Sequence, residues 1–382
     1  MKAKTSRRGD VPPFYAMEVL REANTRAAAG EQVLHLEVGQ PGTAAPSGVI
    51  EAAKHALASH RLGYTEALGV GELRQRIALH YRDMYGLAVD PARVVITTGS
   101  SGGFMLSFLA AFDHGDRVAL AAPGYPAYRN ILQALGLSPV SIPTGADSRF
   151  QPTVAHLAAL ESGVQGLIVA SPSNPTGTML SRSELGAVYA HCRDRGIRLI
   201  SDEIYHGITY GERATTVLSF GDAAIVVNSF SKYFSMTGWR LGWMILPEDL
   251  LRPVERLAQN LFISPPTLPQ LAAQAVFDCK EELDGNVRRY GENRRILLEN
   301  LPRAGFDSLA PADGAFYIYA DVSRLTNDSQ EFCRRMLAET GVAATPGIDF
   351  DPERGHRFVR FSFAGATADI ATAAERLITW RR

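Results

Sequence analysis

Short apolar runs alternate with helical patterns through the middle of this chain. Five of these runs end in polar or glycine-rich residues: 94–97, 118–122, 167–171, 198–202 and 224–229. Strands that are separated by helices usually pair in parallel and have both faces covered. The pattern therefore predicts an α/β fold with a mostly parallel sheet, whose ligands would bind at the carboxyl ends of the strands.

The length of the chain indicates more than one domain, because 382 residues exceed what one ordinary hydrophobic core serves. The apolar run 241–246 follows the preceding strand too closely for a helical crossover, so we expect it to pair antiparallel. Residues 282–300 are rich in leucine and charged side chains, which predicts a long helix leaving the sheet. We place the domain boundary there, with a large domain at 41–284 and a smaller one at 285–382.

The composition gives no reason to expect a nucleic-acid or membrane partner. The chain has 39 basic and 40 acidic residues, so it is close to neutral. No stretch reaches the ~20 apolar residues of a membrane span, and the basic N-terminus is not followed by an apolar signal region. The three cysteines are widely spaced, which indicates neither a disulfide framework nor a zinc site. We expect a cytoplasmic protein.

One lysine lies in an unusual setting directly after the last of the parallel runs. In Ser-Phe-Ser-Lys-Tyr-Phe-Ser-Met-Thr-Gly-Trp-Arg, Lys232 is surrounded by hydroxyl groups, a glycine and an arginine. A lysine amine has a pKa of ~10.4 and becomes a good nucleophile at neutral pH only when burial or a nearby cation lowers that value. Ser229, Ser231 and Arg240 would hold a phosphate beside it. The alternative is a solvated loop charge.

Other polar residues follow the neighbouring runs. Asn174 comes after the run 167–171, and Asp202 and Tyr205 come at the end of the next run. An aspartate leaving a buried strand needs a partner, and a protonated pyridine nitrogen is suitable. The alternatives are that Asp202 caps a helix, that Asn174 forms a turn and that Tyr205 belongs to the core.

Two further features indicate sites for anions. Thr-Thr-Gly-Ser-Ser-Gly-Gly-Phe at 97–104 offers backbone amides at a helix N-terminus, where a phosphate would bind well, although such glycines can also serve tight packing. Arg360 lies in an apolar, strand-like run and requires a carboxylate, either from a substrate or from a structural salt bridge.

Together these motifs resemble the class I/II aminotransferases, which are pyridoxal-phosphate enzymes of fold type I. Ser-Asn-Pro-Thr-Gly at 173–177 is followed by Asp-x-x-Tyr at 202–205 and by Ser-x-Ser-Lys at 229–232. The likeness extends from Val-Gly-Gln-Pro-Gly at 38–42 to Phe-Val-Arg-Phe-Ser-Phe at 358–363, and so covers nearly the whole chain.

The resemblance implies a mostly parallel seven-stranded sheet flanked by helices, plus a smaller α+β domain to which residues 1–40 also belong. It implies pyridoxal 5′-phosphate as cofactor, in a Schiff base with Lys232. Asp202 would bind the ring nitrogen, and Tyr205 and Asn174 the 3′-oxygen. The remaining cofactor-binding candidates carry hydroxyl, amide, guanidinium or aromatic groups: Ser100, Ser101, Gly102, Tyr125, Ser229, Ser231 and Arg240.

The resemblance also assigns a substrate site and a partner. Arg360 would bind the substrate α-carboxylate, assisted by Asn174 and the backbone at Gly39. Tyr64 lies in Leu-Gly-Tyr-Thr-Glu-Ala-Leu-Gly, which resembles the segment that reaches the cofactor phosphate of a partner subunit. We therefore expect a homodimer with shared active sites.

The predicted activity is transfer of an amino group from an L-amino acid to a 2-oxo acid, with Lys232 moving the proton. A C–S β-lyase or a cyclopropane-forming synthase would share these motifs. A cofactor-binding sensor domain is disfavoured because only about forty residues precede the motif at 38–42. Ser101 stands where some aspartate-using relatives carry a lysine, which weakens an aspartate-specific reading. Phe14, Tyr15 and Phe104 are pocket or core candidates.

Overall fold

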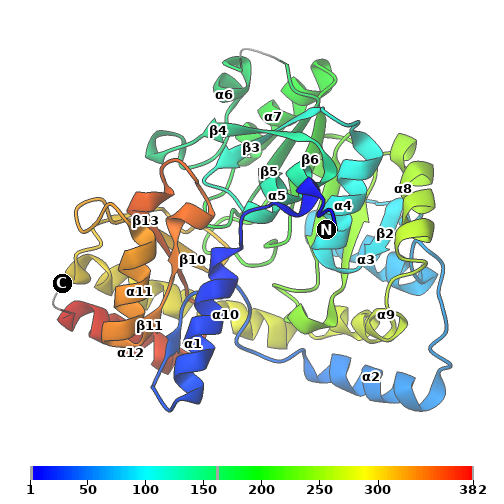
Figure 1. Ribbon diagram of the computed structural model, residues 1–382. Helices are drawn as coiled ribbons and strands as arrows, with labels where there is room; N and C mark the ends of the chain where they lie inside the picture. The colour runs from blue at the N-terminus through cyan, green and yellow to red at the C-terminus, as the bar shows by residue number, and fades with distance from the viewer. Residues whose placement is uncertain (1–2, 161–162, 381–382) are drawn as a thin grey trace.

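The computed structural model describes residues 3–160 and 163–380, and its centre is a seven-stranded sheet (Figure 1). The strand order is β2-β8-β7-β6-β5-β3-β4. Only β8 runs antiparallel to its neighbours, as the short connection before it predicts. The strands of this sheet are β2 (Val94–Thr97), β3 (Arg117–Ala122), β4 (Ser138–Pro143), β5 (Gly166–Ala170), β6 (Arg198–Asp202), β7 (Ile225–Ser229) and β8 (Gly242–Ile245).

The sheet is buried on both faces, which explains why its strands read as continuous apolar runs. Every residue of β2, β7 and β8 is buried. Except in the edge strand β4, alternate residues of the strands enter two separate hydrophobic clusters: Val226 belongs to one, and its neighbours Ile225 and Val227 belong to the other. Successive side chains of a strand point to opposite faces, so the sheet has a hydrophobic core on each face.

Helices cover both faces of this sheet and form much of the rest of the molecule. Helices α4, α5 and α8 contribute to the cluster that contains Val227, whereas α3 and α7 contribute to the other. The helices are α1 (Tyr15–Ala28), α2 (Ser47–Ser59), α3 (Gly71–Tyr85), α4 (Gly99–Ala111), α5 (Pro126–Leu135), α6 (Val154–Ala158), α7 (Arg182–Asp194), α8 (Glu248–Leu261), α9 (Thr267–Ala273), α10 (Lys280–Asn300), α11 (Ser329–Thr340) and α12 (Thr367–Thr379).

A smaller, antiparallel sheet has the order β12-β13-β10-β9. Its strands are β9 (Ser308–Leu309), β10 (Tyr317–Asp321), β12 (Thr345–Pro346) and β13 (Phe358–Ser362). Helices α10, α11 and α12 lie around it, together with the N-terminal α1 (Figure 1). The helix expected at 282–300 is therefore present as α10. The domain boundary that we place inside it stays a prediction.

The N-terminal segment joins this second layer. The short strand β1 (Leu34–His35) pairs in parallel with β11 (Val342–Ala343). One residue later, Leu36 O accepts a hydrogen bond from Ser362 N at 2.7 Å. The chain then passes Gly39 on its way to the large sheet, which brings the N-terminal segment close to the site described below. In the described part of the chain, no helix combines the length and the apolar character needed to cross a membrane.

Candidate functional site

The polar residues predicted from strand ends come together at the carboxyl edge of the large sheet. Strands β5, β6 and β7 are neighbours and run parallel. Asn174 follows β5, Asp202 is the last residue of β6, and Lys232 follows β7 by three residues. Parallel pairing therefore brings residues that are far apart in the sequence to one edge.

Lys232 points toward the N-terminal segment. Its Nζ donates a hydrogen bond to Gly39 O at 2.5 Å and lies 5.9 Å from the centre of the Tyr205 ring. Burial lowers the pKa of Lys232 to about 8, with further lowering from Arg360 and Arg240, while Asp202 opposes the shift. The setting makes this amine far easier to deprotonate near neutral pH than a solvated lysine.

Asp202 is buried, with 4% of its surface exposed. Its Oδ2 accepts a hydrogen bond from the Tyr128 hydroxyl, and its Oδ1 accepts one from Ile204 N at 3.0 Å. Burial raises the pKa of this carboxyl group to about 6, although both hydrogen bonds and Lys232 lower it. The segment after Asp202 is a turn, so Asp202 does not cap an α-helix.

Tyr205 is held by a second tyrosine that the sequence patterns did not single out. The hydroxyl groups of Tyr205 and Tyr317 share a hydrogen bond of 2.7 Å, and both rings are buried. Tyr317 also explains why residue 39 is glycine, because a Cβ there would lie 1.9 Å from the Tyr317 hydroxyl oxygen. The close approach of Gly39 brings its carbonyl oxygen within reach of Lys232.

Arg360 is almost fully buried, and neutral groups bind it. Its Nη1 donates to Asn174 Oδ1 at 2.9 Å, and its Nη2 donates to Thr345 Oγ1 at 3.0 Å and to Glu37 O. Within the described ranges, Arg360 forms no ion pair with a carboxylate, and its Nε has no hydrogen-bond partner. In the described residues Arg360 therefore forms no structural salt bridge, and its charge remains available for an anion.

The guanidinium plane of Arg360 is held between two aromatic rings. Its central carbon lies 4.4 Å from the centre of the Tyr317 ring and 4.8 Å from that of Phe350. Such contacts stabilise a cation without neutralising it. The orientation of Arg360 is thus fixed while its charge is retained.

The glycine-rich turn after β2 leads into α4, as predicted. The residue before this helix, Thr98, makes no side-chain hydrogen bond to the first turn. A Cβ on Gly99 would lie 2.6 Å from Arg240 Nη2, so this guanidinium lies directly against the start of the helix. A Cβ on Gly102 would lie 2.6 Å from Thr98 Oγ1. The helix N-terminus and Arg240 together form a concentration of positive potential.

The serines of the lysine segment adjoin this helix start. Ser229 pairs with Gly242 across β7 and β8, and a Cβ on Gly242 would lie 2.9 Å from Ser100 N. Ser231 N donates to Ser229 Oγ at 3.1 Å, and the two hydroxyl oxygens are 2.9 Å apart. Ser101, by contrast, is exposed. The predicted anion-binding groups are therefore neighbours.

Tyr125 lies between the end of β3 and the start of α5. Its ring makes edge contacts with Phe14 at 5.9 Å and with Tyr128 at 5.3 Å. Burial raises the pKa of its hydroxyl group to about 12, with contributions from Tyr317 and Asp202. Tyr125 therefore lies at the same edge of the sheet, and its predicted contact with a cofactor ring stays a prediction.

Tyr64 does not join the other predicted residues. It is 83% exposed and lines an open cavity of about 1080 Å³ together with Thr98, Phe262 and Pro265. No hydrogen bond of the Tyr64 side chain occurs in the part of the chain that is described. The interpretation that Tyr64 serves a partner subunit stays a prediction.

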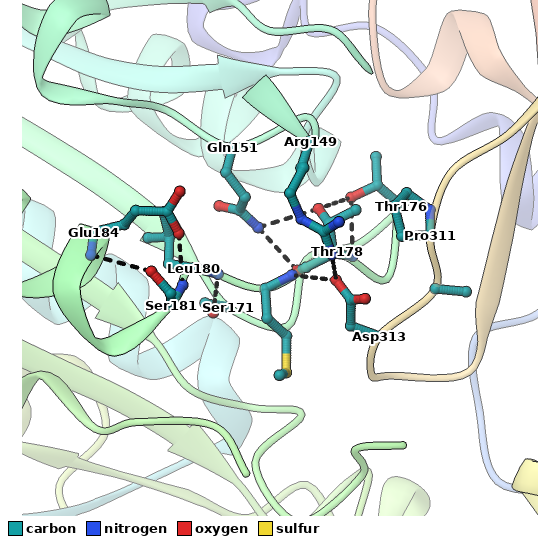
Figure 2. A network of polar contacts seen from close by, with 12 residues as sticks. Arg149, Gln151, Ser171, Thr176, Thr178, Leu180, Ser181, Glu184, Pro311 and Asp313 are labelled. Carbon is teal, nitrogen blue, oxygen red and sulfur yellow. Dashed lines mark hydrogen bonds and ion pairs between the residues drawn. The ribbon is translucent and has the colours of Figure 1, made fainter. Parts of the chain in front are cut away.

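A polar network holds the segment 176–181, which directly follows Asn174 in the chain (Figure 2). The amide Nε2 of Gln151 donates to Thr178 O at 2.9 Å and to Ala170 O at 3.1 Å. Asp313 accepts from Arg149 Nη2 at 2.6 Å and from Met179 N at 3.2 Å. Asn174 itself accepts a hydrogen bond from Arg360 Nη1 at 2.9 Å.

Sequence reasoning missed Tyr128, Tyr317, Thr345 and Phe350. Tyr128 lies in the first turn of α5, three residues after the N-cap Tyr125, so helical spacing could have indicated it. The other three belong to the smaller sheet and its loops, and only tertiary packing brings them to this edge.

Comparisons with known proteins agree with this geometry. The sequence profile of the family described as "Aminotransferase class I and II" matches residues 31–377. The chain is 51% identical to the valine–pyruvate aminotransferase of Mycobacterium tuberculosis, over 100% of this chain and 99% of that protein. The crystal structure of an aminotransferase from the same organism superposes with a TM-score of 0.97, at 51% identity and 99% coverage of both chains. Thermus thermophilus aspartate aminotransferase with maleate gives a TM-score of 0.92 at 29% identity, covering 98% of this chain and 99% of that chain.

Proposed function

Because the chain belongs to the class I and II aminotransferase family, we propose that it transfers the amino group of an apolar L-amino acid such as valine to pyruvate, with pyridoxal 5′-phosphate held at Lys232. The chain is an aminotransferase, and its substrates are an amino acid and an oxo acid. The family generally uses this cofactor. The choice of valine and pyruvate follows the relative that shares 51% of its residues over its full length.

The residues of the site fit this cofactor. The start of α4, where Gly99 leaves no room for a side chain beside Arg240, suits a phosphate. Asp202 is a buried carboxylate whose hydrogen bonds come from neutral donors, and it suits the proton on a pyridine nitrogen. Tyr205 would hydrogen-bond the ring oxygen. When bound, pyridoxal phosphate supplies an electron sink for the charge that develops at the substrate α-carbon.

Lys232 would move the proton in the reaction. With a pKa lowered to about 8, its amine can accept the proton from the substrate α-carbon at near-neutral pH and return it. The hydrogen bond from Nζ to Gly39 O shows that the Lys232 side chain reaches the N-terminal segment beside Tyr205.

A buried, charged arginine without a carboxylate partner is the observation that carries the proposal. Arg360 is oriented by Asn174, Thr345 and two nearby rings, yet among the described residues no carboxylate lies within ion-pair distance of it. An amino acid or 2-oxo acid supplies the missing carboxylate. The directional, two-pronged pairing of arginine with a carboxylate would orient the α-carbon toward Lys232.

The surroundings favour an uncharged substrate side chain. Phe14 contacts Tyr125 at the sheet edge and supplies apolar surface there. Phe104, the other pocket candidate, is 2% exposed and packs in the core cluster beneath α4. Ser101 brings no positive charge to the start of α4, so that position offers nothing to neutralise an acidic side chain.

The homodimer remains part of the proposal. Tyr64 is exposed beside an open cavity, where its hydroxyl group would be free to reach a partner's cofactor phosphate. Mixing Tyr64→Phe chains with Lys232→Ala chains should restore partial activity through hybrid dimers, whereas a fully active monomer in sedimentation would contradict it. We also retain the cytoplasmic location as a prediction that cell fractionation can test.

The proposed activity is tested by measuring alanine formation from pyruvate with a panel of L-amino acids, in the presence of pyridoxal phosphate. L-Valine should be among the best donors, and Lys232→Ala should lower turnover by several orders of magnitude while the protein still binds the cofactor. Preference for aspartate with 2-oxoglutarate would contradict the proposed substrates. Release of ammonia and pyruvate from cysteine-type substrates without an acceptor would indicate β-elimination instead.

A further inference from the structure

Asp349 makes contacts that the proposed reaction does not account for. It ends a short 3-10 helix, η8 (Gly347–Asp349), and is 2% exposed. Its two carboxylate oxygens accept hydrogen bonds from Tyr15 N and Ala16 N, each at 3.2 Å. These amides are the first two of α1, whose own N-cap residue, Phe14, makes no side-chain capping bond. A residue more than 300 positions away therefore caps the N-terminal helix.

This cap determines where Phe14 lies. The Phe14 ring meets the Tyr125 ring at 5.9 Å with an interplanar angle of 72°. Since Phe14 directly precedes the two capped amides, Asp349 fixes the residue that presents apolar surface to the sheet edge. Loss of the cap would release the start of α1 and with it this aromatic contact.

The carboxylate of Asp349 interacts electrostatically with Arg360, the predicted carboxylate-binding residue. Burial raises the pKa of Asp349 to about 6, and the groups that oppose this shift are the amides of Ala16 and Tyr15, Arg360 on β13 and Arg129 on α5. Asp349 also acts on Tyr125. The side chain therefore lies within electrostatic reach of both Arg360 and the aromatic pair.

We propose that Asp349 is a positioning and specificity-determining residue, which holds Phe14 at the substrate site and disfavours substrates with an acidic side chain. This inference rests on the proposed function for Arg360. One carboxylate of the substrate pairs with Arg360. A second carboxylate, as in aspartate, would enter a poorly solvated region that already contains the negative charge of Asp349. A neutral, branched side chain would instead pack on Phe14.

The neighbouring Asp351 shows that this role is not general to the loop. Its carboxylate accepts bonds from Glu353 N and Arg354 N of its own turn and from Arg354 Nε at 2.8 Å. Asp351 is thus neutralised locally by Arg354. Asp349 has no ion pair within 4.0 Å in the described segments.

The test compares Asp349→Asn with Phe14→Ala and with a matched control, Asp328→Asn. Asp328 also caps a helix, accepting from Gln330 N and Glu331 N of α11, but it lies on the exposed side of that helix. Each purified holoenzyme is assayed for KM and kcat with panels of neutral and acidic L-amino acids. Melting temperature and cofactor absorbance show whether each variant is folded and loaded.

Asp349→Asn should raise KM for the best neutral donor about fivefold, because the amide nitrogen that replaces one carboxylate oxygen cannot accept a bond from α1, with kcat changed less than threefold. Its preference for neutral over acidic donors should fall about tenfold or more, because the repelling charge is gone. Phe14→Ala should reproduce the loss for neutral donors without the gain for acidic ones. Asp328→Asn keeps the one oxygen that accepts both α11 amides, so KM, kcat and donor preference should stay as in the wild type.

An unchanged neutral-to-acidic preference in folded, active Asp349→Asn would overturn the inference, as would a wild-type enzyme that prefers acidic donors. Should Asp349→Asn not fold, Phe14→Ala decides, because unaltered KM for neutral donors in that variant would refute the positioning role. If the enzyme uses another neutral donor but not valine with pyruvate, the proposed substrates are wrong. The preference of Asp349→Asn for neutral over acidic donors still tests the role of Asp349 in that case.

Discussion

Replacing Arg360 by lysine tests the carboxylate-binding role, because it keeps the charge and removes the forked geometry. The guanidinium uses Nη1 for Asn174 and Nη2 for Thr345, at 2.9 and 3.0 Å, and a substrate carboxylate would complete the set. A single ammonium group cannot hold these acceptors and a carboxylate in one plane. The loss of a charged hydrogen bond is about 1.5–3 kcal/mol, and a stranded buried acceptor adds about 1 kcal/mol.

The sum of about 2.5–4 kcal/mol corresponds to a decrease in kcat/KM of roughly 60- to 700-fold, since every 1.4 kcal/mol is about tenfold. Most of it should appear in KM for both the amino acid and the oxo acid, because both carry the same carboxylate. Steady-state kinetics with each substrate varied gives the two values. Arg357→Lys is the control, since Arg357 is exposed three residues earlier in the chain and should change kcat/KM less than twofold. A decrease below threefold in Arg360→Lys would refute the reasoning.

Three other predictions follow from buried groups with shifted pKa values. The rate at which cofactor-free protein takes up pyridoxal phosphate should rise with pH through about 8, because the neutral Lys232 amine is needed, and a midpoint near the ordinary value of 10.5 in stopped-flow absorbance would contradict this. Tyr128→Phe removes a hydrogen bond that favours the charged form of Asp202, so the acidic limb of the kcat–pH profile should move upward by about one unit; an unmoved limb would show that Asp202 does not control it. Burial raises the pKa of Glu203 from 4.5 to about 7. Between these two values the folded state binds more protons than the unfolded state. The free energy of unfolding therefore falls as the pH rises through this range. Glu203→Gln should therefore become more stable relative to wild type between pH 5 and 8, by up to about 3 kcal/mol. A stability difference between variant and wild type that is the same at every pH would contradict this.

The sequence runs predicted six of the seven strands of the large sheet and the convergence of their ends, whereas the edge strand β4 was not among them. Asn174, Asp202 and Lys232 each follow an apolar run, and parallel pairing places such residues at one edge whatever the details of packing. The strand bounds differ from the predicted ones by about one residue, and the antiparallel β8 follows from the short connection before it. Local pattern and topology are enough for this part of the site.

Residues from the smaller sheet could not be predicted in the same way. Tyr317 and Thr345 reach the site only because that sheet packs against the edge of the large one, and their sequence patterns are those of ordinary buried strands. Asp349 acts on a helix at the other end of the chain. Tyr64 is the opposite case, because its motif was recognised while the structure leaves its side chain exposed, and a role at a partner subunit stays a prediction.

The most direct test of the account is the visible absorbance of the purified protein, loaded with pyridoxal phosphate, before and after L-valine is added without an oxo acid. The account predicts a visible band of the cofactor attached to Lys232, which valine converts to the band of the aminated cofactor and pyruvate restores. Lys232→Ala should lack the starting band. A band that no neutral amino acid converts, or an unchanged spectrum in Lys232→Ala, would contradict the claim that Lys232 and Arg360 form the amino-transfer site.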